Sequence, residues 1–326
     1  MTAPFVTLSD IEAARERIVE KIVRTPTVLS PSFSERLGVP VWLKLEHRQT
    51  TGSFKLRGAS NAVSSLSNGE KSRGVVAAST GNHGRALAHA ARLEGMRAVI
   101  CMSRLVPDNK VAEIRRLGAD IRIVGKSQDE AQGEVERLVA EEGLVMLPPF
   151  DHAAIIAGQG TAGLEMLDDV PDAATVVVPV SGGGLAAGIA AALKGRKPSI
   201  RVVGVSMDRG AAMKASLDAG RPAQVEEMPS LADSLGGGIG LDNRLTFAMV
   251  GDLLDDIVLV SEQEIAAGMV HAYREEREIV EGAGAVGIAA LLAGKIRADG
   301  PVVVLLSGRN VDMEMHRRVV CGEWAG

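Results

Sequence analysis

The sequence predicts an α/β protein with two domains and mostly parallel sheets. Apolar, strand-like segments alternate with helical segments along the chain, which is typical of a parallel sheet with helices on both faces. The 326 residues are enough for two domains. The 37 glycines indicate many tight turns, and the 2% aromatic content leaves a core of Ala, Val, Leu and Ile.

The first half of the chain supplies one complete α/β series. A capping box formed by Ser9 and Glu12 predicts a helix that runs to about Val23. Alternating apolar residues predict a strand at 41–46, and residues 54–66 an amphipathic helix. The next expected elements are a strand at 74–79, a helix at 82–93, a strand at 97–102, a helix at 109–117, a strand at 121–124, a helix from 127 to 142 that opens with a capping box of Ser127 and Glu130, and a strand at 144–147.

Two prolines in the segment LPPFDH (147–152) interrupt this alternation, so we place a domain crossing there. A second α/β series follows. Its expected elements are a strand at 174–180, a glycine-rich turn and helix at 181–195, a strand at 201–206, a helix containing Met213, a glycine-rich loop at 234–240, a helix at 262–278, the small-residue segment 281–294, and a final strand within 301–310.

Charge and cysteine content narrow the function classes. The net charge is −5 and no long basic run occurs, which argues against nucleic acid or an anionic membrane as a partner. Cys101 and Cys321 form neither a disulfide framework nor a zinc pattern. The N-terminus has no apolar core of the kind found in signal peptides, and no apolar run reaches the length of a membrane span. We therefore expect a soluble, cytoplasmic protein.

The turn after the 174–180 strand is the strongest chemical signal. Ser181 and the glycines at 182–184 lead directly into a helix, so backbone N–H groups and the positive end of the helix dipole converge on one point. Such a point binds anions, phosphate above all. A plain tight turn is the alternative. The pattern also fits a dinucleotide fingerprint, but the next strand ends in Ser206 where that fingerprint expects an acid.

Three more loops carry polar groups at strand or helix ends. Ser79, Thr80, Asn82 and His83 precede or begin a helix, where they suit a carboxylate or a ring hydroxyl, with ordinary capping as the alternative. Ser307 follows the last strand and is either a ligand contact or a turn serine. Glu281 begins a small-residue helix as a cap or a site wall.

Lys55 stands in QTTGSFKLRGAS (49–60), where a loop becomes a helix. An exposed lysine needs no such setting, whereas a reactive lysine must be held in place. The segments TGSFKLRGA, STGNHG, SGGGL and SGRN, in this order, together with IAGQGTAGLE (156–165), resemble the fold-type II pyridoxal-phosphate (PLP) enzymes. Within that fold, which is similar to the tryptophan synthase β subunit, they resemble the threonine/serine dehydratase and serine racemase branch. The resemblance spans essentially the whole chain, and no regulatory domain is expected after Ser307.

The resemblance implies a large PLP-binding domain at 1–69 and 152–326 and a small, mobile, substrate-side domain at 70–151, both open twisted α/β units. It also implies a homodimer. Lys55 would hold the cofactor as an internal Schiff base and act as the base on the substrate's Cα proton. The remaining implied contacts are Phe54 beside the cofactor, Asn82 at its ring hydroxyl, Ser181, Gly182, Gly183, Gly184 and Leu185 at its phosphate, Ser307 at its pyridine nitrogen, and Ser79, Thr80, Asn82 and His83 at the substrate carboxylate.

The expected reaction is β-elimination of a hydroxyl from a β-hydroxy amino acid. Thr80 stands where racemases of this branch place a serine, which argues against efficient racemisation. Arg309 replaces a glycine beside the ring. Ser206, Gly210 and Ala212 replace the branch's divalent-metal ligands, so no metal is expected. β-Replacement, racemisation, an NAD-dependent reaction and a non-catalytic binding protein are the alternatives. Among relatives, EHRQTTGSFKLRGA and SGRNVD look most like the hydroxyectoine-utilisation dehydratases.

Overall fold

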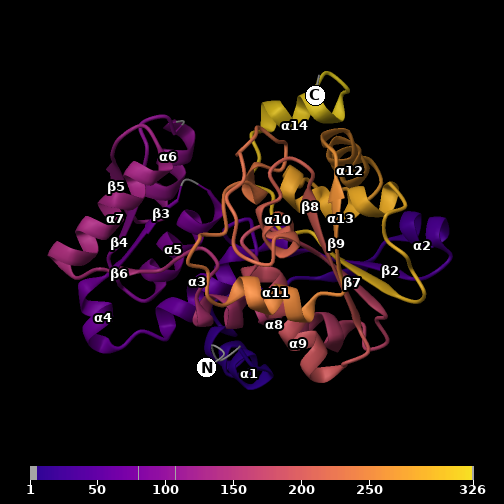
Figure 1. Cartoon of the computed structure of the whole chain (residues 1–326), viewed down its shortest axis with the longest axis horizontal. Coiled ribbons are helices and arrows are strands. Elements are labelled where there is room, and N and C mark those ends of the chain that lie inside the picture. Colours follow the sequence, from indigo (N-terminus) through magenta and orange to yellow (C-terminus); the bar gives the residue numbers. More distant parts are fainter. Residues whose placement is uncertain (1–5, 80, 107, 325–326) are drawn as a thin grey trace.

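The computed structural model describes residues 6–79, 81–106 and 108–324, and these residues form two sheets (Figure 1). In the larger sheet β1 pairs antiparallel with β2 and every other pair is parallel, and the smaller sheet is parallel throughout. The larger sheet has the order β1 (Thr27–Leu29), β2 (Val41–Lys44), β10 (Val302–Leu305), β7 (Thr175–Pro179), β8 (Arg201–Met207) and β9 (Asp256–Val260). The smaller has the order β5 (Asp120–Ile123), β4 (Ala98–Met102), β3 (Val75–Ala78) and β6 (Val145–Met146).

Helices cover both faces of the larger sheet. In β7, Val176 and Val178 face one hydrophobic cluster and Val177 faces another, which explains why this strand is an uninterrupted apolar run. The first cluster takes residues from α1 (Leu8–Ile18), α8 (Ala153–Asp169), α9 (Gly184–Arg196), α10 (Ala212–Asp218) and α11 (Thr246–Leu253). The second takes residues from α2 (Pro31–Leu37), α12 (Glu262–Arg274), α13 (Gly282–Leu292) and α14 (Met313–Val320).

The smaller sheet is covered in the same way. One cluster joins it to α3 (Lys55–Ser64), α5 (Asn82–Leu93) and α6 (Asp108–Arg116), and a second packs α7 (Gln128–Glu142) on the other face. The short α4 (Asn68–Arg73) leads into β3. Helix α3 also contacts α8, so it lies between the two sheets. Among the described residues, no helix is both long and apolar enough to cross a membrane.

The structure confirms most of the predicted elements and corrects some. The helix at 82–93 and the capping box of Ser127 and Glu130 are confirmed. The capping box of Ser9 and Glu12 is wrong: Thr7 accepts from the Asp10 N–H, and the Asp10 carboxylate accepts from the Thr7 N–H at 2.8 Å. The first helix ends at Ile18, and α12 ends at Arg274. The prediction also missed α2, α4, α8, α11, α14, β1 and β9.

The segment that connects β6 to α8 is held firmly against the larger sheet's loops. The Asp151 carboxylate accepts hydrogen bonds from the N–H groups of Arg244, Leu245 and Thr246, at 2.8, 2.9 and 2.8 Å, and so caps α11. The Phe150 ring packs against Gly182, and the Cα, Cβ and carbonyl oxygen of Phe150 lie against Gly184. The predicted interruption at 147–152 is therefore a fixed crossing between the two sheets.

A buried ion cluster joins three segments beneath α3. The Arg57 guanidinium donates to both oxygens of Glu46, each at 2.8 Å, and to both oxygens of Glu165, at 2.8 and 2.7 Å. Lys44 donates to Glu165 at 2.6 Å. These two bidentate pairs tie α3 to the end of β2 and to α8, and they fix the helix on which Lys55 is the first residue.

The charges of this cluster depend on one another. Burial by itself lowers the pKa of Arg57, but Glu46 and Glu165 outweigh that effect and raise it. Burial likewise raises the pKa of Glu46, but Arg57 outweighs it and the net pKa is lowered. Removing one partner therefore leaves an uncompensated charge in the protein interior.

We predict that Arg57→Ala destabilises the fold by roughly 3–5 kcal/mol, because the buried Glu46 carboxylate loses its bonded cation and Glu165 keeps only Lys44. Urea unfolding followed by circular dichroism measures the change. The matched control is Arg137→Ala, which removes an exposed arginine that also binds two glutamates, Glu134 and Glu141, and should leave the midpoint almost unchanged. Equal effects of the two substitutions would contradict the importance of the cluster.

Candidate active site

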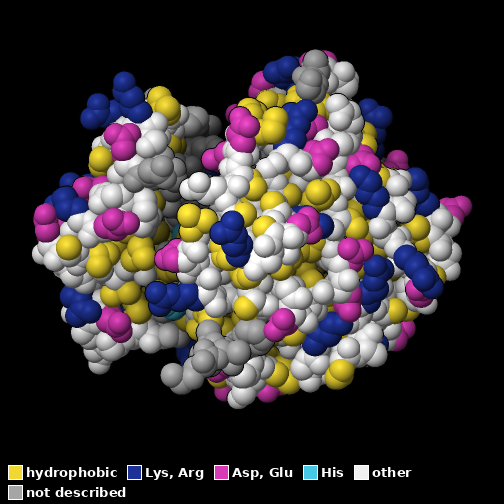
Figure 2. Space-filling view, in the orientation of Figure 1, with side chains coloured by type: hydrophobic (Ala, Val, Ile, Leu, Met, Phe, Trp, Pro, Cys, Tyr) yellow, Lys and Arg dark blue, Asp and Glu magenta, His cyan; other side chains and the backbone are white. Residues whose placement is uncertain are grey.

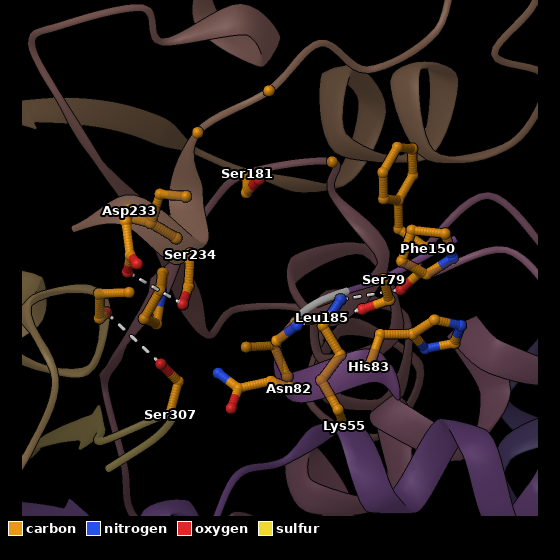
Figure 3. A pocket seen from close by; sticks show the side chains of 18 of the residues that line it. Lys55, Ser79, Asn82, His83, Phe150, Ser181, Leu185, Asp233, Ser234 and Ser307 are labelled. Atoms are coloured by element: carbon orange, nitrogen blue, oxygen red, sulfur yellow. Dashed lines mark hydrogen bonds between the residues drawn. The ribbon is translucent and has the colours of Figure 1, made fainter. Parts of the chain in front are cut away.

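A cavity of about 540 Å³ opens where strands of both sheets end (Figures 2 and 3). The carboxyl ends of β3, β7 and β10 lead into Ser79, Ser181 and Ser307, and all three line it. Such an edge is the usual ligand site of a parallel sheet. Figure 2 shows the molecule hollowed between the part that carries the smaller sheet and the rest. The structure thus brings together four motifs that lie far apart in the sequence.

The glycine loop forms one wall of the cavity. Gly183 has φ +87°, a left-handed conformation that favours glycine, and it is the N-cap of α9. A Cβ at Gly182 would lie 2.2 Å from the Phe150 ring, and one at Gly184 2.9 Å from the Phe150 Cα. Close packing against Phe150 therefore requires glycine at positions 182 and 184, in addition to the glycine that the turn requires at position 183. The unpaired N–H groups of the first turn of α9 make this wall an anion site.

Lys55 lies across the cavity from this loop. Its Nζ donates to the Pro149 carbonyl at 2.9 Å and lies 5.3 Å from the centre of the Phe54 ring. Burial lowers the pKa of Lys55 to about 8, while the Glu281 carboxylate acts in the opposite direction. About a tenth of this amine is therefore unprotonated at pH 7, far more than for a lysine of ordinary pKa, and the unprotonated form is the one that acts as nucleophile or base.

Ser79 and His83 have local partners. The Ser79 Oγ accepts from the Gly84 N–H at 3.0 Å, so this side chain is a helix cap as well as a cavity wall. The His83 Nε2 donates to the Leu147 carbonyl at 2.8 Å, and burial together with Lys55 lowers the pKa of His83 to about 4. The neutral ring has only that one proton to donate. Thr80, predicted between these residues, lies outside the described residues.

Asn82 and Ser307 both face the cavity, and Figure 3 shows them on the same side of it. The Ser307 Oγ has one long contact, 3.4 Å, to the Ala283 carbonyl, so its hydroxyl keeps most of its capacity for another partner. Asn82 is held by two side chains, Glu281 and Asn310. Leu185 also lines the cavity.

Sequence reasoning missed several lining residues and left one undecided. Glu281 is the N-cap residue of α13, but its side chain does not cap the helix, because the carboxylate lies in the cavity wall. Burial, and after it the charge of Asp233, raise the pKa of Glu281 to about 7. Phe150 and Asn310 lie within quoted motifs but had no assigned role. The loop at 233–238 also lines the cavity. Arg309 is exposed and is not part of the wall.

These residues fit a phosphate-bearing pyridine aldehyde. The glycine loop and the start of α9 form a cradle for the phosphate. The Lys55 amine lines the same cavity, where it can react with the aldehyde. Asn82 and Ser307 supply neutral polar groups for the substituents of a ring. Metal ions have no such arrangement here: no group of three His, Cys, Asp or Glu side chains suited to a metal occurs in the part of the chain that the structure describes.

The family model for pyridoxal-phosphate dependent enzymes matches residues 18–308. The chain belongs to this family. Pyridoxal phosphate is therefore the cofactor whose fit to the cavity has to be considered. This result confirms the predicted family and fold class, and it supports PLP as the cofactor in place of the NAD alternative.

Three relatives illustrate the similarity. A Sinorhizobium fredii protein named "Putative threonine dehydratase" is 64% identical over 318 residues, 97% of this chain and 96% of that protein. L-threonine ammonia-lyase of Thermotoga maritima is 41% identical over 97% of this chain and 78% of that protein. Among solved structures, maize serine racemase superposes with a TM-score of 0.92 at 33% identity, covering 98% of each chain.

We predict that Gly182→Ala weakens PLP binding at least tenfold, because the new Cβ forces the cradle away from the Phe150 ring. A PLP titration followed by absorbance measures the affinity. Gly133→Ala is the matched control: this exposed glycine in α7 has nothing within 4 Å of a built Cβ, so PLP binding should be unchanged. An unaltered affinity in Gly182→Ala would mean that the loop does not hold the phosphate.

We also predict the pH dependence of the Lys55 amine in the cofactor-free protein. Only the unprotonated amine attacks an aldehyde, so PLP capture, trapped by borohydride and located by mass spectrometry, should rise with pH through a midpoint near 8. In Glu281→Gln the midpoint should be lower, since that carboxylate opposes the effect of burial on the pKa of Lys55. A midpoint near 10 in the unmodified protein would refute this account.

Proposed function

We propose that the protein is a PLP-dependent lyase that removes the hydroxyl of a β-hydroxy amino acid and releases a 2-keto acid and ammonia. One observation carries the proposal: an amine whose pKa is lowered to about 8, that of Lys55, faces the same cavity as a glycine cradle at the start of α9. The similarity to a threonine ammonia-lyase and to a protein named as a threonine dehydratase supports this reaction.

PLP and Lys55 would carry out the chemical steps of this reaction. PLP, when bound, withdraws electrons from the Cα of the joined amino acid and so acidifies its Cα proton. Lys55 would hold the cofactor covalently, and its amine, once the substrate amine has taken that place, would accept the Cα proton. Loss of the protonated β-hydroxyl as water, followed by hydrolysis of the unsaturated product by another water molecule, would give the keto acid and ammonia, so the overall reaction is a deamination.

The remaining residues bind and orient. The phosphate is held by Ser181, the glycines at 182–184 and Leu185, with Phe54 beside the ring. The substrate carboxylate is held at the first turn of α5, where backbone N–H groups of residues 82 and 83 add to Ser79 and Thr80. Because the single proton of the neutral His83 ring is used by Leu147, this residue contributes through its backbone.

Ser307 is assigned to the pyridine nitrogen. A neutral hydroxyl there stabilises negative charge on the ring less than a carboxylic acid would. We therefore expect prompt loss of the β-substituent in preference to transamination. The alternative reaction is β-replacement, in which a second nucleophile takes the place of the β-hydroxyl. It differs from elimination because it needs a co-substrate.

Racemisation is a second candidate, which the superposition with maize serine racemase favours. It requires a proton donor on the ring face opposite Lys55. In the sequence, Thr80 stands where the racemases have the serine that serves this role, and its hydroxyl belongs to a secondary alcohol. We infer that racemisation is at most a side reaction.

We also propose three features of the working enzyme. Residues 70–151 form a small domain that moves against 1–69 and 152–326, since the cavity lies between the two sheets. The enzyme is a cytoplasmic homodimer; the absence of a disulfide between Cys101 and Cys321 suits a reducing compartment. Its substrate belongs to hydroxyectoine breakdown, which the motifs EHRQTTGSFKLRGA and SGRNVD support.

The decisive experiment measures keto acid and ammonia from threonine, serine, hydroxyaspartate and hydroxyectoine-derived amino acids without any second substrate. At least one should give both products in equal amounts, and chiral analysis of the remaining substrate reports racemisation. Lys55→Ala should abolish both turnover and the visible absorption of bound PLP, while Lys126→Ala, an exposed lysine, should not. Formation of product only when sulfide or another nucleophile is added would favour β-replacement.

A further inference from the structure

The side-chain amide of Asn310 has an orientation that follows from its partners. Its Nδ2 lies 2.9 Å from the Thr51 carbonyl oxygen, and a backbone carbonyl can only accept a hydrogen bond. The atom facing Thr51 is therefore the amide nitrogen. The same nitrogen lies 2.6 Å from the Asn82 side chain, so its second hydrogen is directed there. Both hydrogens of this amide are thus used, and a main-chain atom sets their direction.

The orientation of Asn82 follows in turn. The atom that faces the Asn310 nitrogen must be an acceptor, so it is the Asn82 oxygen. The Asn82 nitrogen then faces Glu281 and donates to its Oε1 at 2.8 Å. An amide nitrogen carries two hydrogens, and Glu281 takes one of them. Since Asn82 lines the cavity, the second hydrogen is available to a bound molecule.

Glu281 accepts at both oxygens. Its Oε2 receives the backbone N–H of Asn310 at 3.0 Å, and its own N–H donates to the Gly308 carbonyl at 3.1 Å. A Cβ at position 308 would lie 2.5 Å from Oε1, so glycine is needed for this approach. The backbone N–H of Asn310 can only donate, the Asn82 nitrogen is already directed here by Asn310, and the carboxylate is buried. Glu281 and Asn310 therefore hold the Asn82 amide from both ends.

We propose that Asn310 and Glu281 are positioning residues that keep Asn82 a hydrogen-bond donor toward an oxygen acceptor on the cofactor ring. This proposal rests on the proposed function, in which Asn82 meets the ring hydroxyl of PLP. A donated N–H stabilises the ionised form of that oxygen. With the amide free to turn, its carbonyl oxygen faces the ring for part of the time and opposes ionisation.

A double-mutant cycle on PLP binding tests the proposal. Asn82→Ala and Asn310→Ala should each weaken PLP binding about tenfold or more, because a hydrogen bond to a charged oxygen is lost or weakened. The double variant should bind PLP no more weakly than Asn82→Ala alone, since Asn310 acts through Asn82. In Asn310→Ala, the pH at which the visible absorption of bound PLP changes should rise by about one unit.

Arg309→Ala is the control within the same loop. Its side chain is exposed and makes no hydrogen bond or ion pair with another described residue, so affinity and spectrum should be those of the unmodified protein. If Asn310→Ala does not fold, judged by the melting temperature of the cofactor-free protein, Glu281→Gln replaces it in the same cycle. A glutamine side chain has only one oxygen, so it cannot accept one hydrogen bond at each end as the Glu281 carboxylate does.

Two outcomes would overturn the proposal. One is an Asn310→Ala effect that persists in the Asn82→Ala background, because the residue would then act on the fold and not through Asn82. The other is an affinity and spectrum unchanged in Asn310→Ala. Neither readout depends on turnover. A protein that binds PLP with the expected cycle and forms no keto acid would contradict the proposed function and leave this inference standing.

Discussion

The position of Lys55 depends on a cation buried two residues later in the same helix. Arg57 is completely buried, and its guanidinium is shared between Glu46, just after β2, and Glu165, in the C-terminal part of α8. Charges are costly to bury unless every donor and acceptor is satisfied, so this geometry tolerates little change. Helix α3 is therefore fixed relative to the larger sheet and α8, and its first residue is held at the edge where the strands end.

The motif loops could be predicted from the sequence because their signals are local. Three successive glycines after an apolar run indicate a strand, a turn and a helix within a few residues, and the structure places β7, Gly183 and α9 there. The helix at 82–93 was likewise predicted with its observed bounds. In contrast, β1 and β9 are the two edge strands of the larger sheet and are only partly buried, so neither shows the apolar run of a central strand, and helix α8 is too evenly apolar to show a one-sided pattern.

The roles of individual side chains were harder to predict for a similar reason. Asn82 and Glu281 are 199 residues apart in the chain, and Asn310 is 228 residues from Asn82. No local pattern signals such a contact. His83 shows the converse: its sequence position suits a ligand contact, yet the nearby Leu147 carbonyl uses the proton of its ring. Residue types and their positions in loops are enough to predict which residues line the cavity. The direction of each hydrogen bond can be known only from the folded structure.

The crossing at 147–152 has a mechanical consequence. Phe150 and Asp151 are held on the larger sheet's side, so any rotation of the smaller sheet would have its pivot before Phe150 and would leave the glycine loop in place. Asn82, by contrast, belongs to α5, which packs on the smaller sheet. Its contacts to Glu281 and Asn310 therefore bridge the two halves of the molecule, and a rotation that separated the halves would also release the Asn82 amide from its fixed direction.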